Sequence, residues 1–252
     1  MIFTSYHQSA LPLALLLRTA GVARITAISE DYPGSLLDVR HRGVPAGVPE
    51  PERARGVAAA AGFGLPDGDD GRLRVRGVRR DRPGDYLVVH PGASVEARSC
   101  PPDDLRTVVR ALAGHGHRVV VTAGPGEKPL ATYVADSVAG LVGPTSLTDL
   151  AHLLAGAACL VAGNTGPAHL AAAVGTPVVS LFAPTVPYAQ WGPYRVPAVR
   201  LGDAGAPCRD TRATRCPVPG HPCLSALDPA QVLAAVTRLG ARRAEHRGEV
   251  AA

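Results

Sequence analysis

The chain has 252 residues, of which 46% are hydrophobic, so it can hold one large or two small domains with cores of their own. Its net charge is +5, but the arginines are scattered and not gathered into a stripe with aromatic neighbours, which argues against nucleic-acid binding. No stretch approaches the roughly 20 apolar residues of a membrane span, so at most peripheral contact with a membrane is expected.

The five cysteines argue against the disulfide framework of a secreted protein and favour a cytoplasmic location. Three of them share a proline-rich segment with His221 and would suit zinc: Cys208, Cys216 and Cys223. No Cys-x-x-Cys pair occurs in the segment, so a lid loop with incidental thiols is the favoured interpretation, and no metal is expected.

The first part of the chain carries an incomplete α/β pattern. Strands are predicted at residues 1–4 and 24–28, and helices at residues 11–20 and 52–61. An open parallel sheet of two or three strands leaves its apolar faces poorly covered, so part of a domain is expected to be missing.

A segment rich in glycine, aspartate and arginine follows at residues 62–82 and is predicted to be a solvated linker. We therefore expect a partial N-terminal α/β domain with its linker at residues 1–80 and a second domain at residues 81–252.

From Tyr86 onward, short β-rich runs alternate with helical stretches, which is typical of a doubly wound parallel sheet. Five strands are predicted, at residues 86–90, 117–122, 140–142, 157–162 and 178–182. Five helices are predicted, at residues 102–113, 128–138, 147–154, 168–174 and 229–239. The third helix has a capping box, because Ser146 precedes it and Asp149 follows three residues later.

In an open α/β sheet, ligands bind beyond the carboxyl ends of the strands. Four turns there carry suggestive residues: 91–98, 123–127, 144–147 and 164–169. In the last turn, glycines break an apolar run before Pro167 opens a helix, whose free N–H groups suit a phosphate.

These turns together suit a nucleoside-diphosphate sugar. Arg98 and the helix N-terminus near residue 168 can hold a diphosphate, and Glu127 can accept hydrogen bonds from a ribose diol. The further candidate donor-binding residues are Ser94, Ser146, Leu147, Asn164, Thr165, Gly166 and His169. The competing interpretation is a tight turn with a buried histidine and ordinary surface charges.

The string from Asn164 to Thr185 resembles the donor-binding signature of glycosyltransferase family 9, the heptosyltransferase family. Thr165, Gly166 and His169 match the core of that signature without a gap. Arg98 follows a His-Pro-Gly-Ala-Ser run, where relatives usually carry a lysine that contacts the donor phosphates.

The chain departs from the family pattern at three places. Asn164 stands where many members have aspartate, and Cys100 stands where a tryptophan is common. The Gly-x-x-x-Glu pattern that reaches the donor ribose is one residue shorter here, between Gly124 and Glu127.

The resemblance implies an α/β fold of the GT-B type, with a Rossmann-like doubly wound C-terminal domain. It also implies an inverting glycosyltransferase that uses no metal and no cofactor. The donor would be a nucleoside-diphosphate sugar resembling ADP-heptose, and the acceptor a cell-envelope glycan or a lipid-linked molecule.

No catalytic residue is predicted. Relatives carry the aspartate that acts as general base in a Gly-Asp motif near the start of the N-terminal domain, and this chain does not contain that start. Asp31, Asp38 and His7 are substitutes without a spacing argument. The main alternative is a nucleotide-sugar-binding fragment without turnover. A GT-B epimerase is weaker, and a Rossmann oxidoreductase weaker still, since no Gly-x-Gly-x-x-Gly follows a first strand.

Overall fold

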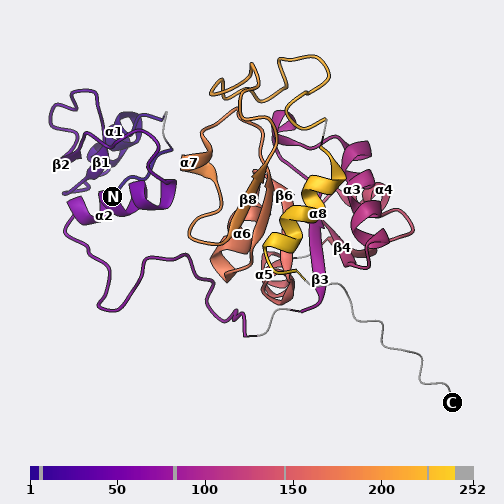
Figure 1. Ribbon diagram of the computed structural model, residues 1–252. Coiled ribbons are helices and arrows are strands. Elements are labelled where there is room, and N and C mark those ends of the chain that lie inside the picture. The colour runs from indigo at the N-terminus through magenta and orange to yellow at the C-terminus, as the bar shows by residue number, and fades with distance from the viewer. Residues whose placement is uncertain (6–7, 82–83, 145, 226, 242–252) are drawn as a thin grey trace. The chain divides into compact units, whose positions relative to one another are not determined.

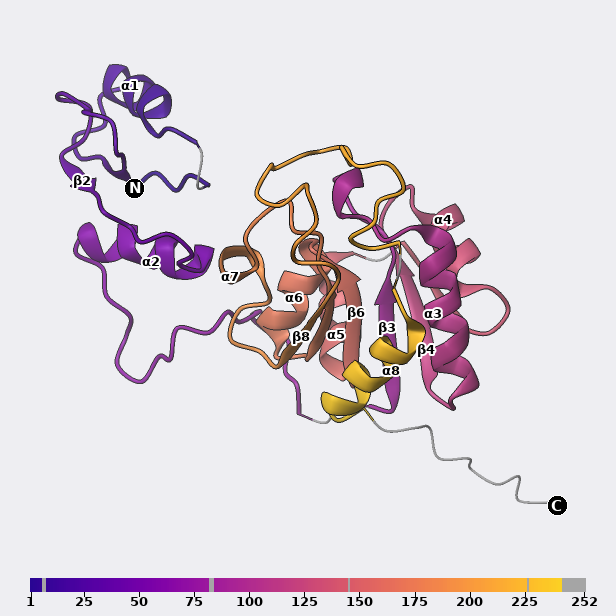
Figure 2. The same cartoon turned by 45° about the horizontal axis from the view of Figure 1, so that its top comes forward.

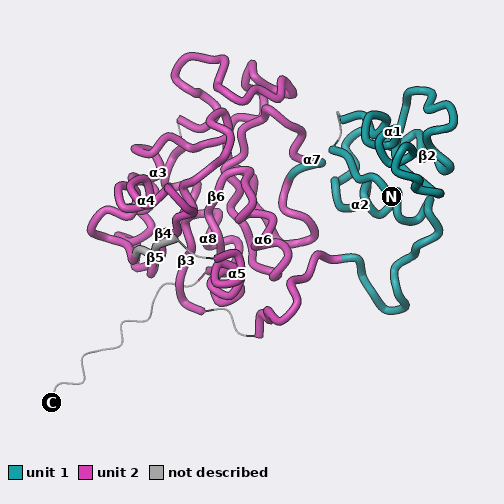
Figure 3. The backbone as a smooth tube through the Cα atoms, turned by 180° about the vertical axis from the view of Figure 1, so that it is seen from behind, with its two compact units in different colours: residues 1–71, 189–191 teal, residues 72–188, 192–252 magenta. Residues whose placement is uncertain are grey.

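A computed structural model describes residues 1–5, 8–81, 84–144, 146–225 and 227–241. The chain divides into two compact units, coloured separately in Figure 3. Unit 1 is Met1–Gly71 with Ala189–Trp191, and unit 2 is the rest of the chain from Arg72 onward. The domain boundary that the sequence suggested at residue 80 stays a prediction.

Unit 1 holds a short parallel sheet flanked by helices. Its elements are α1 (Leu11–Thr19), β1 (Thr26–Ile28), β2 (Val39–His41) and α2 (Glu50–Ala60). The predicted first strand is reduced to a single bridge between Ile2 and Ala27. A small apolar core includes Ile2, Ala14 and Ile25. β2 was not predicted from the sequence, because Val-Arg-His is not an apolar run.

Unit 2 is built on a six-stranded, wholly parallel sheet in the order β5-β4-β3-β6-β7-β8. The strands are β3 (Tyr86–His90), β4 (Arg118–Ala123), β5 (Gly140–Pro144), β6 (Cys159–Gly163), β7 (Val178–Leu181) and β8 (Ala198–Leu201). The chain winds outward from β3 in one direction and from β6 in the other, so this is a doubly wound sheet, as predicted.

Helices cover both faces of this sheet (Figure 1). On one face lie α3 (Pro102–Gly114), α4 (Lys128–Ala135) and α8 (Pro229–Arg238), packed on the larger apolar cluster. On the other lie α5 (Leu147–Gly156) and α6 (Gly166–Val174), packed on a second cluster. Figure 2 shows the same layers with the loops beyond the carboxyl ends of the strands brought forward.

The predicted strands and helices of unit 2 are all present, with shifts of a few residues at their ends. Ser146 caps α5 as predicted: its Oγ accepts from the Asp149 N–H at 3.1 Å. α4 ends at Ala135, earlier than predicted, because Asp136 takes a positive φ of 52° while its carboxylate binds Arg106 and Arg110 of α3.

Two elements of unit 2 were not predicted, η1 (Glu96–Arg98) and β8, and neither was α7 (Tyr188–Trp191), which spans the boundary of the two units. β8 is an edge strand whose four residues are only half-buried, so it lacks the continuous apolar run that marks the central strands.

The basic stretch at residues 72–81 belongs to unit 2, and its interpretation as a solvated linker is wrong for Arg80. The half-buried Arg80 guanidinium donates to the carbonyls of Ala155 at 2.9 Å and Ala157 at 2.6 Å, and to Thr176 Oγ1 at 3.1 Å. These partners surround the amino ends of β6 and β7, so Arg80 fixes the entry into unit 2.

Candidate functional site

The two inner strands of the sheet, β3 and β6, mark its topological switch point. The chain leaves their carboxyl ends toward opposite sides, which opens a crevice suited to ligands. The predicted turns at residues 91–98 and 164–169 are therefore neighbours. A Cβ built on Gly163 would lie 2.9 Å from the Arg98 carbonyl oxygen, so glycine is what lets the two turns approach.

Arg98 ends η1, a single turn of 3-10 helix held by the long loop between β8 and α8. The Ala97 N–H donates to the Thr214 carbonyl at 3.1 Å, and the Cys216 N–H donates to Glu96 Oε2 at 2.9 Å. The Arg98 guanidinium is half-buried, its Nε is without a partner among the described residues, and burial lowers its pKa. A desolvated cation without a counter-ion is suited to an anionic ligand.

The second turn combines a helix N-terminus with a buried amide. Asn164 is 7% exposed, and its Nδ2 finds no partner among the described residues. Thr165 is the N-cap of α6, but its side chain caps nothing. Pro167 has no N–H and the Ala168 N–H donates to the Thr165 carbonyl at 3.1 Å, so the Gly166 N–H and the positive end of the helix dipole are what this turn offers a ligand. His169 lies in the first turn, where burial lowers the pKa of its imidazole.

Glu127 is an anchored group and not a free surface charge. The Gly124 N–H donates to Glu127 Oε2 at 2.7 Å, and His90 Nε2 lies 3.7 Å from the same oxygen. A Cβ built on Gly92 would lie 2.1 Å from Glu127 Oε1, so the carboxylate rests directly on that glycine. The carboxylate remains 30% exposed at the carboxyl ends of β3 and β4.

His90 belongs to a row of residues that crosses the sheet at its carboxyl end and is polar except for Ala162; we call it the polar row. Register pairs place His90, Ala162, Ser180 and Arg200 side by side on β3, β6, β7 and β8. His90 Nδ1 lies 3.0 Å from Thr122 Oγ1, which extends the row to β4. The row two residues earlier is wholly apolar: Val88, Leu160, Val178 and Ala198.

The remaining predicted residues lie at the periphery of this edge. Ser94 is exposed in the turn after β3, and Gly166 is exposed at the start of α6. Ser146 and Leu147 are exposed at the start of α5, beyond β5, three strands and roughly 14 Å from β6. The Ser146 hydroxyl is already engaged, because it also donates to Asp149 Oδ2 at 2.6 Å.

Sequence reasoning missed three polar residues at the same edge: His90, Thr185 and Arg200. Thr185 is fully buried, its Oγ1 has no partner among the described residues, and the Arg212 N–H donates to its carbonyl at 2.8 Å. His90 and Arg200 each interrupt an otherwise apolar strand near its end, and that pattern is the signal that could have found them.

The substitute bases gain no support from geometry. Asp38 binds Arg18 and accepts from the Ile25 N–H at 2.6 Å, and this backbone bond and then Arg18 lower its pKa. It thus stabilises the amino ends of β1 and β2. Asp31 is exposed after β1, and His7 lies outside the described residues.

The cysteine-bearing loop is packed onto the sheet edge. Cys208 and Cys223 are buried, and burial raises the pKa of the Cys223 thiol to about 12. Across the part of the chain that the structure describes, no three His, Cys, Asp or Glu side chains gather in an arrangement suited to a metal ion.

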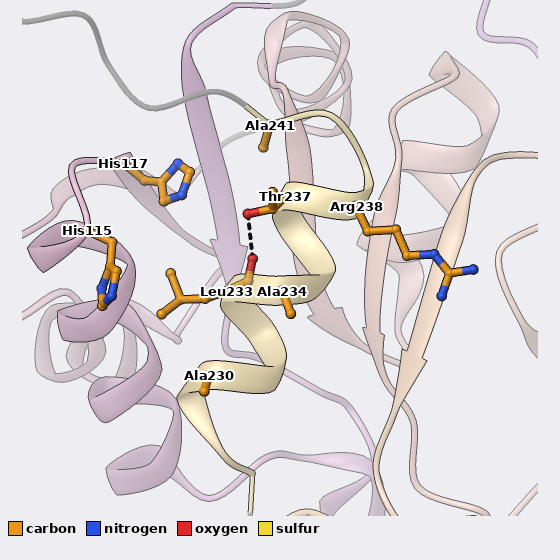
Figure 4. A pocket seen from close by; sticks show the side chains of 8 residues that line it. All are labelled: His115, His117, Ala230, Leu233, Ala234, Thr237, Arg238 and Ala241. Carbon is orange, nitrogen blue, oxygen red and sulfur yellow. Dashed lines mark hydrogen bonds between the residues drawn. The ribbon is translucent and has the colours of Figure 1, made fainter.

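A pocket of about 630 Å³ lies at the opposite, amino edge of the sheet (Figure 4). His115 and His117, which follow α3, face α8 across it. The α8 side is lined by Ala230, Leu233, Ala234, Thr237, Arg238 and Ala241. The C-terminus of α3 lies here, so its free groups are carbonyl oxygens, which do not suit a diphosphate.

Within the described ranges, no helix combines the length and apolar character that a membrane crossing requires. The peripheral membrane contact suggested by the net charge stays a prediction.

Comparison with known proteins gives consistent relatives. Lipopolysaccharide heptosyltransferase 1 of Pseudomonas aeruginosa is 32% identical over 222 residues, which cover 83% of this chain and 62% of that protein. Lipopolysaccharide heptosyltransferase 3 of Escherichia coli is 31% identical over 164 residues, covering 61% and 46% respectively. The chain spans between 33% and 62% of the length of the curated heptosyltransferases that it matches.

Solved structures share the fold. ADP-heptose lipopolysaccharide heptosyltransferase II of Escherichia coli aligns with a TM-score of 0.64 at 18% identity, over 91% of this chain and 73% of that chain. The heptosyltransferase WaaC of Escherichia coli, solved with ADP, gives a TM-score of 0.59 at 22% identity, over 81% and 60%. The predicted fold class, α/β of the GT-B type, is thereby confirmed.

The family model of glycosyltransferase family 9 (heptosyltransferase) matches residues 8–220, which include both turns at the switch point. The resemblance seen in the sequence therefore rests on most of the chain and on the loops that form the candidate site. We conclude that this chain belongs to glycosyltransferase family 9, the heptosyltransferase family.

Proposed function

We propose that this protein transfers a sugar from a nucleoside-diphosphate donor, such as ADP-heptose, to a cell-envelope glycan or a lipid-linked acceptor at the cytoplasmic face of a membrane. The observation that carries the proposal is that the turn ending in Arg98, whose buried Nε has no partner among the described residues, meets the strand end that leads into the N-terminus of α6 at the switch point. The heptosyltransferase relatives support the choice of donor class.

The order of the strands suggests how the donor lies. Glu127, at the ends of β3 and β4, suits the ribose hydroxyls, because a fixed carboxylate accepts hydrogen bonds from a diol. Arg98 and α6, at β3 and β6, suit the diphosphate. The sugar then points toward β7, near Thr185 and its unpaired Oγ1.

In this arrangement the protein itself stabilises the leaving group. As the bond from the anomeric carbon to the diphosphate breaks, negative charge grows on the phosphate oxygens. The proposal places the N-terminus of α6 and the Arg98 cation beside that charge, so no metal is required in the proposed mechanism. The acceptor hydroxyl loses its proton to a base and attacks the opposite face of the sugar, which inverts the anomeric configuration.

The direct test gives purified protein ADP-heptose with a lipopolysaccharide-core acceptor and measures ADP release and the glycosylated product. Transfer that persists in excess EDTA and is lost in Arg98→Gln supports the proposal. The matched control is Arg118→Gln, which removes an exposed arginine at the amino end of β4.

Two other results would replace the proposal. ADP binding without any transfer would favour the alternative of a nucleotide-sugar-binding fragment. An altered donor recovered in the absence of acceptor would favour an epimerase.

A further inference from the structure

Arg200, on β8, has no counter-ion among the described residues, and its guanidinium lies against two aromatic rings. Its guanidinium carbon lies 5.3 Å from the centre of the Phe182 ring and 5.1 Å from that of Tyr188. The two rings themselves meet edge to face, with centroids 4.9 Å apart. This pair fixes the direction of the side chain, because each ring face attracts the cation.

The polar atoms at this place are left without partners. Arg200 Nε is buried and makes no hydrogen bond to any described residue. Ser180, its register neighbour on β7, is 1% exposed, and its Oγ is equally unpaired. Buried polar groups are nearly always satisfied in native proteins, so a pair of unsatisfied groups on one face indicates a place for a ligand.

The position of Arg200 in the sheet indicates which part of the substrates it would contact. Arg200 is level with His90 in the polar row and lies two strands beyond β6, roughly 10 Å from the strand that leads into α6. A diphosphate held at α6 lies nearer to Arg98, whose turn meets the end of β6, than to Arg200, two strands away. In the proposed donor order, the region beyond β7 belongs to the molecule that receives the sugar.

We propose that Arg200, supported by Phe182 and Tyr188, binds an anionic substituent, a phosphate or a carboxylate, on the sugar-accepting substrate. This rests on the proposed function for the identity of the substrate, but the anion site itself does not. Arginine suits either anion, because its planar fork donates two parallel hydrogen bonds.

The experiment follows the Arg200 Nε–H signal by NMR in arginine-labelled protein with saturating ADP, assigned by its loss in Arg200→Lys. The probes are glucose 6-phosphate, glucuronate and neutral glucose. The signal is expected to shift with one or both anionic sugars and not with glucose, and the preferred anion distinguishes phosphate from carboxylate.

Affinity measurements on variants complete the test. Arg200→Gln is expected to weaken binding of the preferred anionic sugar roughly tenfold or more, and Arg200→Lys less. ADP affinity is expected to stay unchanged in both. The matched control is Arg118→Gln, because Arg118 also lies over an aromatic ring, at 5.8 Å from Tyr86, but at the amino end of its strand.

The proposal is overturned if neither anionic sugar shifts the signal, if glucose binds equally well, or if Arg200→Gln binds like the wild type. A matching loss of ADP affinity in Arg200→Gln would overturn it too, because Arg200 would then belong to the donor diphosphate. If the wild type does not bind ADP at all, the proposed function fails while the sugar titration still decides the role of Arg200.

Discussion

A half-buried arginine lies at the amino ends of the strands of the six-stranded sheet, the amino edge, and another lies at their carboxyl ends, the carboxyl edge. Burial lowers the pKa of both, but they differ in their hydrogen bonds. Arg80, at the amino edge, donates to two carbonyl oxygens and a threonine hydroxyl. Arg98, at the carboxyl edge, has a buried Nε with no described partner.

The same contrast extends to the neighbours of each arginine. At the amino edge, Tyr86 OH donates to the Leu153 carbonyl at 2.7 Å. At the carboxyl edge, Asn164, Ser180 and Thr185 each have a buried polar atom that bonds to nothing in the described part of the chain. The pocket of about 630 Å³ lies at the amino edge, so the proposed binding edge is identified by its unsatisfied polar atoms and not by pocket volume.

The largest expected effect is a difference in the free energy of unfolding between variants of Arg80 and Arg98. Arg80→Met leaves the Ala155 and Ala157 carbonyls without their donor and is expected to lower the free energy of unfolding by about 3 kcal/mol. Arg98→Met removes a desolvated charge that has no partner and is expected to leave stability unchanged or slightly higher. Urea unfolding followed by circular dichroism measures the free energy of unfolding of both variants. Equal losses of stability would contradict the proposed difference between the two arginines.

The next effect tests whether Glu127, at the carboxyl ends of the strands, contributes to ADP binding. In Gly92→Ala the new Cβ collides with the Glu127 carboxylate, so Glu127 must move, and affinity for ADP is expected to fall about tenfold. Gly114→Ala is the control, since a Cβ at this position meets nothing within 4 Å. Gly114 is the last residue of α3 and lies away from the site. Calorimetric titration with ADP gives both values; unchanged affinity in Gly92→Ala would remove Glu127 from the site.

A pH dependence is expected from His90, whose pKa is lowered by burial, against an opposing contribution from Glu127. The unfolded chain then binds the proton more readily than the folded protein. Stability contributed by neutral His90 is therefore present above pH about 6.5 and lost as the pH falls below it, by about 1.4 kcal/mol per unit of pKa depression.

The His90→Gln variant should unfold with a flatter pH dependence between pH 7 and 5 than the wild type does. His115→Gln, an exposed site at the amino edge, is the control and should keep the wild-type slope. Identical slopes in all three proteins would show that the polar row contributes nothing to this dependence.

The smallest effect concerns the α5 cap. Ser146→Ala removes the bond from the Asp149 N–H and is expected to lower stability by about 1 kcal/mol. Because the hydroxyl is engaged in the cap, ADP affinity should change by less than about threefold. A much larger loss of affinity, with Asp228→Ala at the α8 cap as the control, would make Ser146 a direct donor ligand.

The sequence predicted the inner layers of unit 2 well, because strands such as β3 and β6 are continuous apolar runs and helices such as α5 carry explicit caps. It did not predict β8, an edge strand without such a run. Arg200 was missed with it, because its significance depends on ring contacts from Phe182 and Tyr188 that no local pattern reveals.

The site was predicted as a set of turns, and the structure adds how they meet. Helix-start signals located α6, and the order of strands placed it beside the turn that carries Arg98. The support of Glu127 by Gly92, Gly124 and His90 was not foreseeable, because it joins the ends of two strands through side-chain packing.

The most direct test is a calorimetric titration of ADP into the wild type, Arg98→Gln and Arg80→Lys, each checked for folding. The contrast between the edges predicts saturable binding by the wild type, a loss of roughly tenfold to a hundredfold in Arg98→Gln, and wild-type affinity in folded Arg80→Lys. Undiminished binding by Arg98→Gln, or no binding by the folded wild type, would contradict the assignment of the carboxyl edge as the nucleotide site.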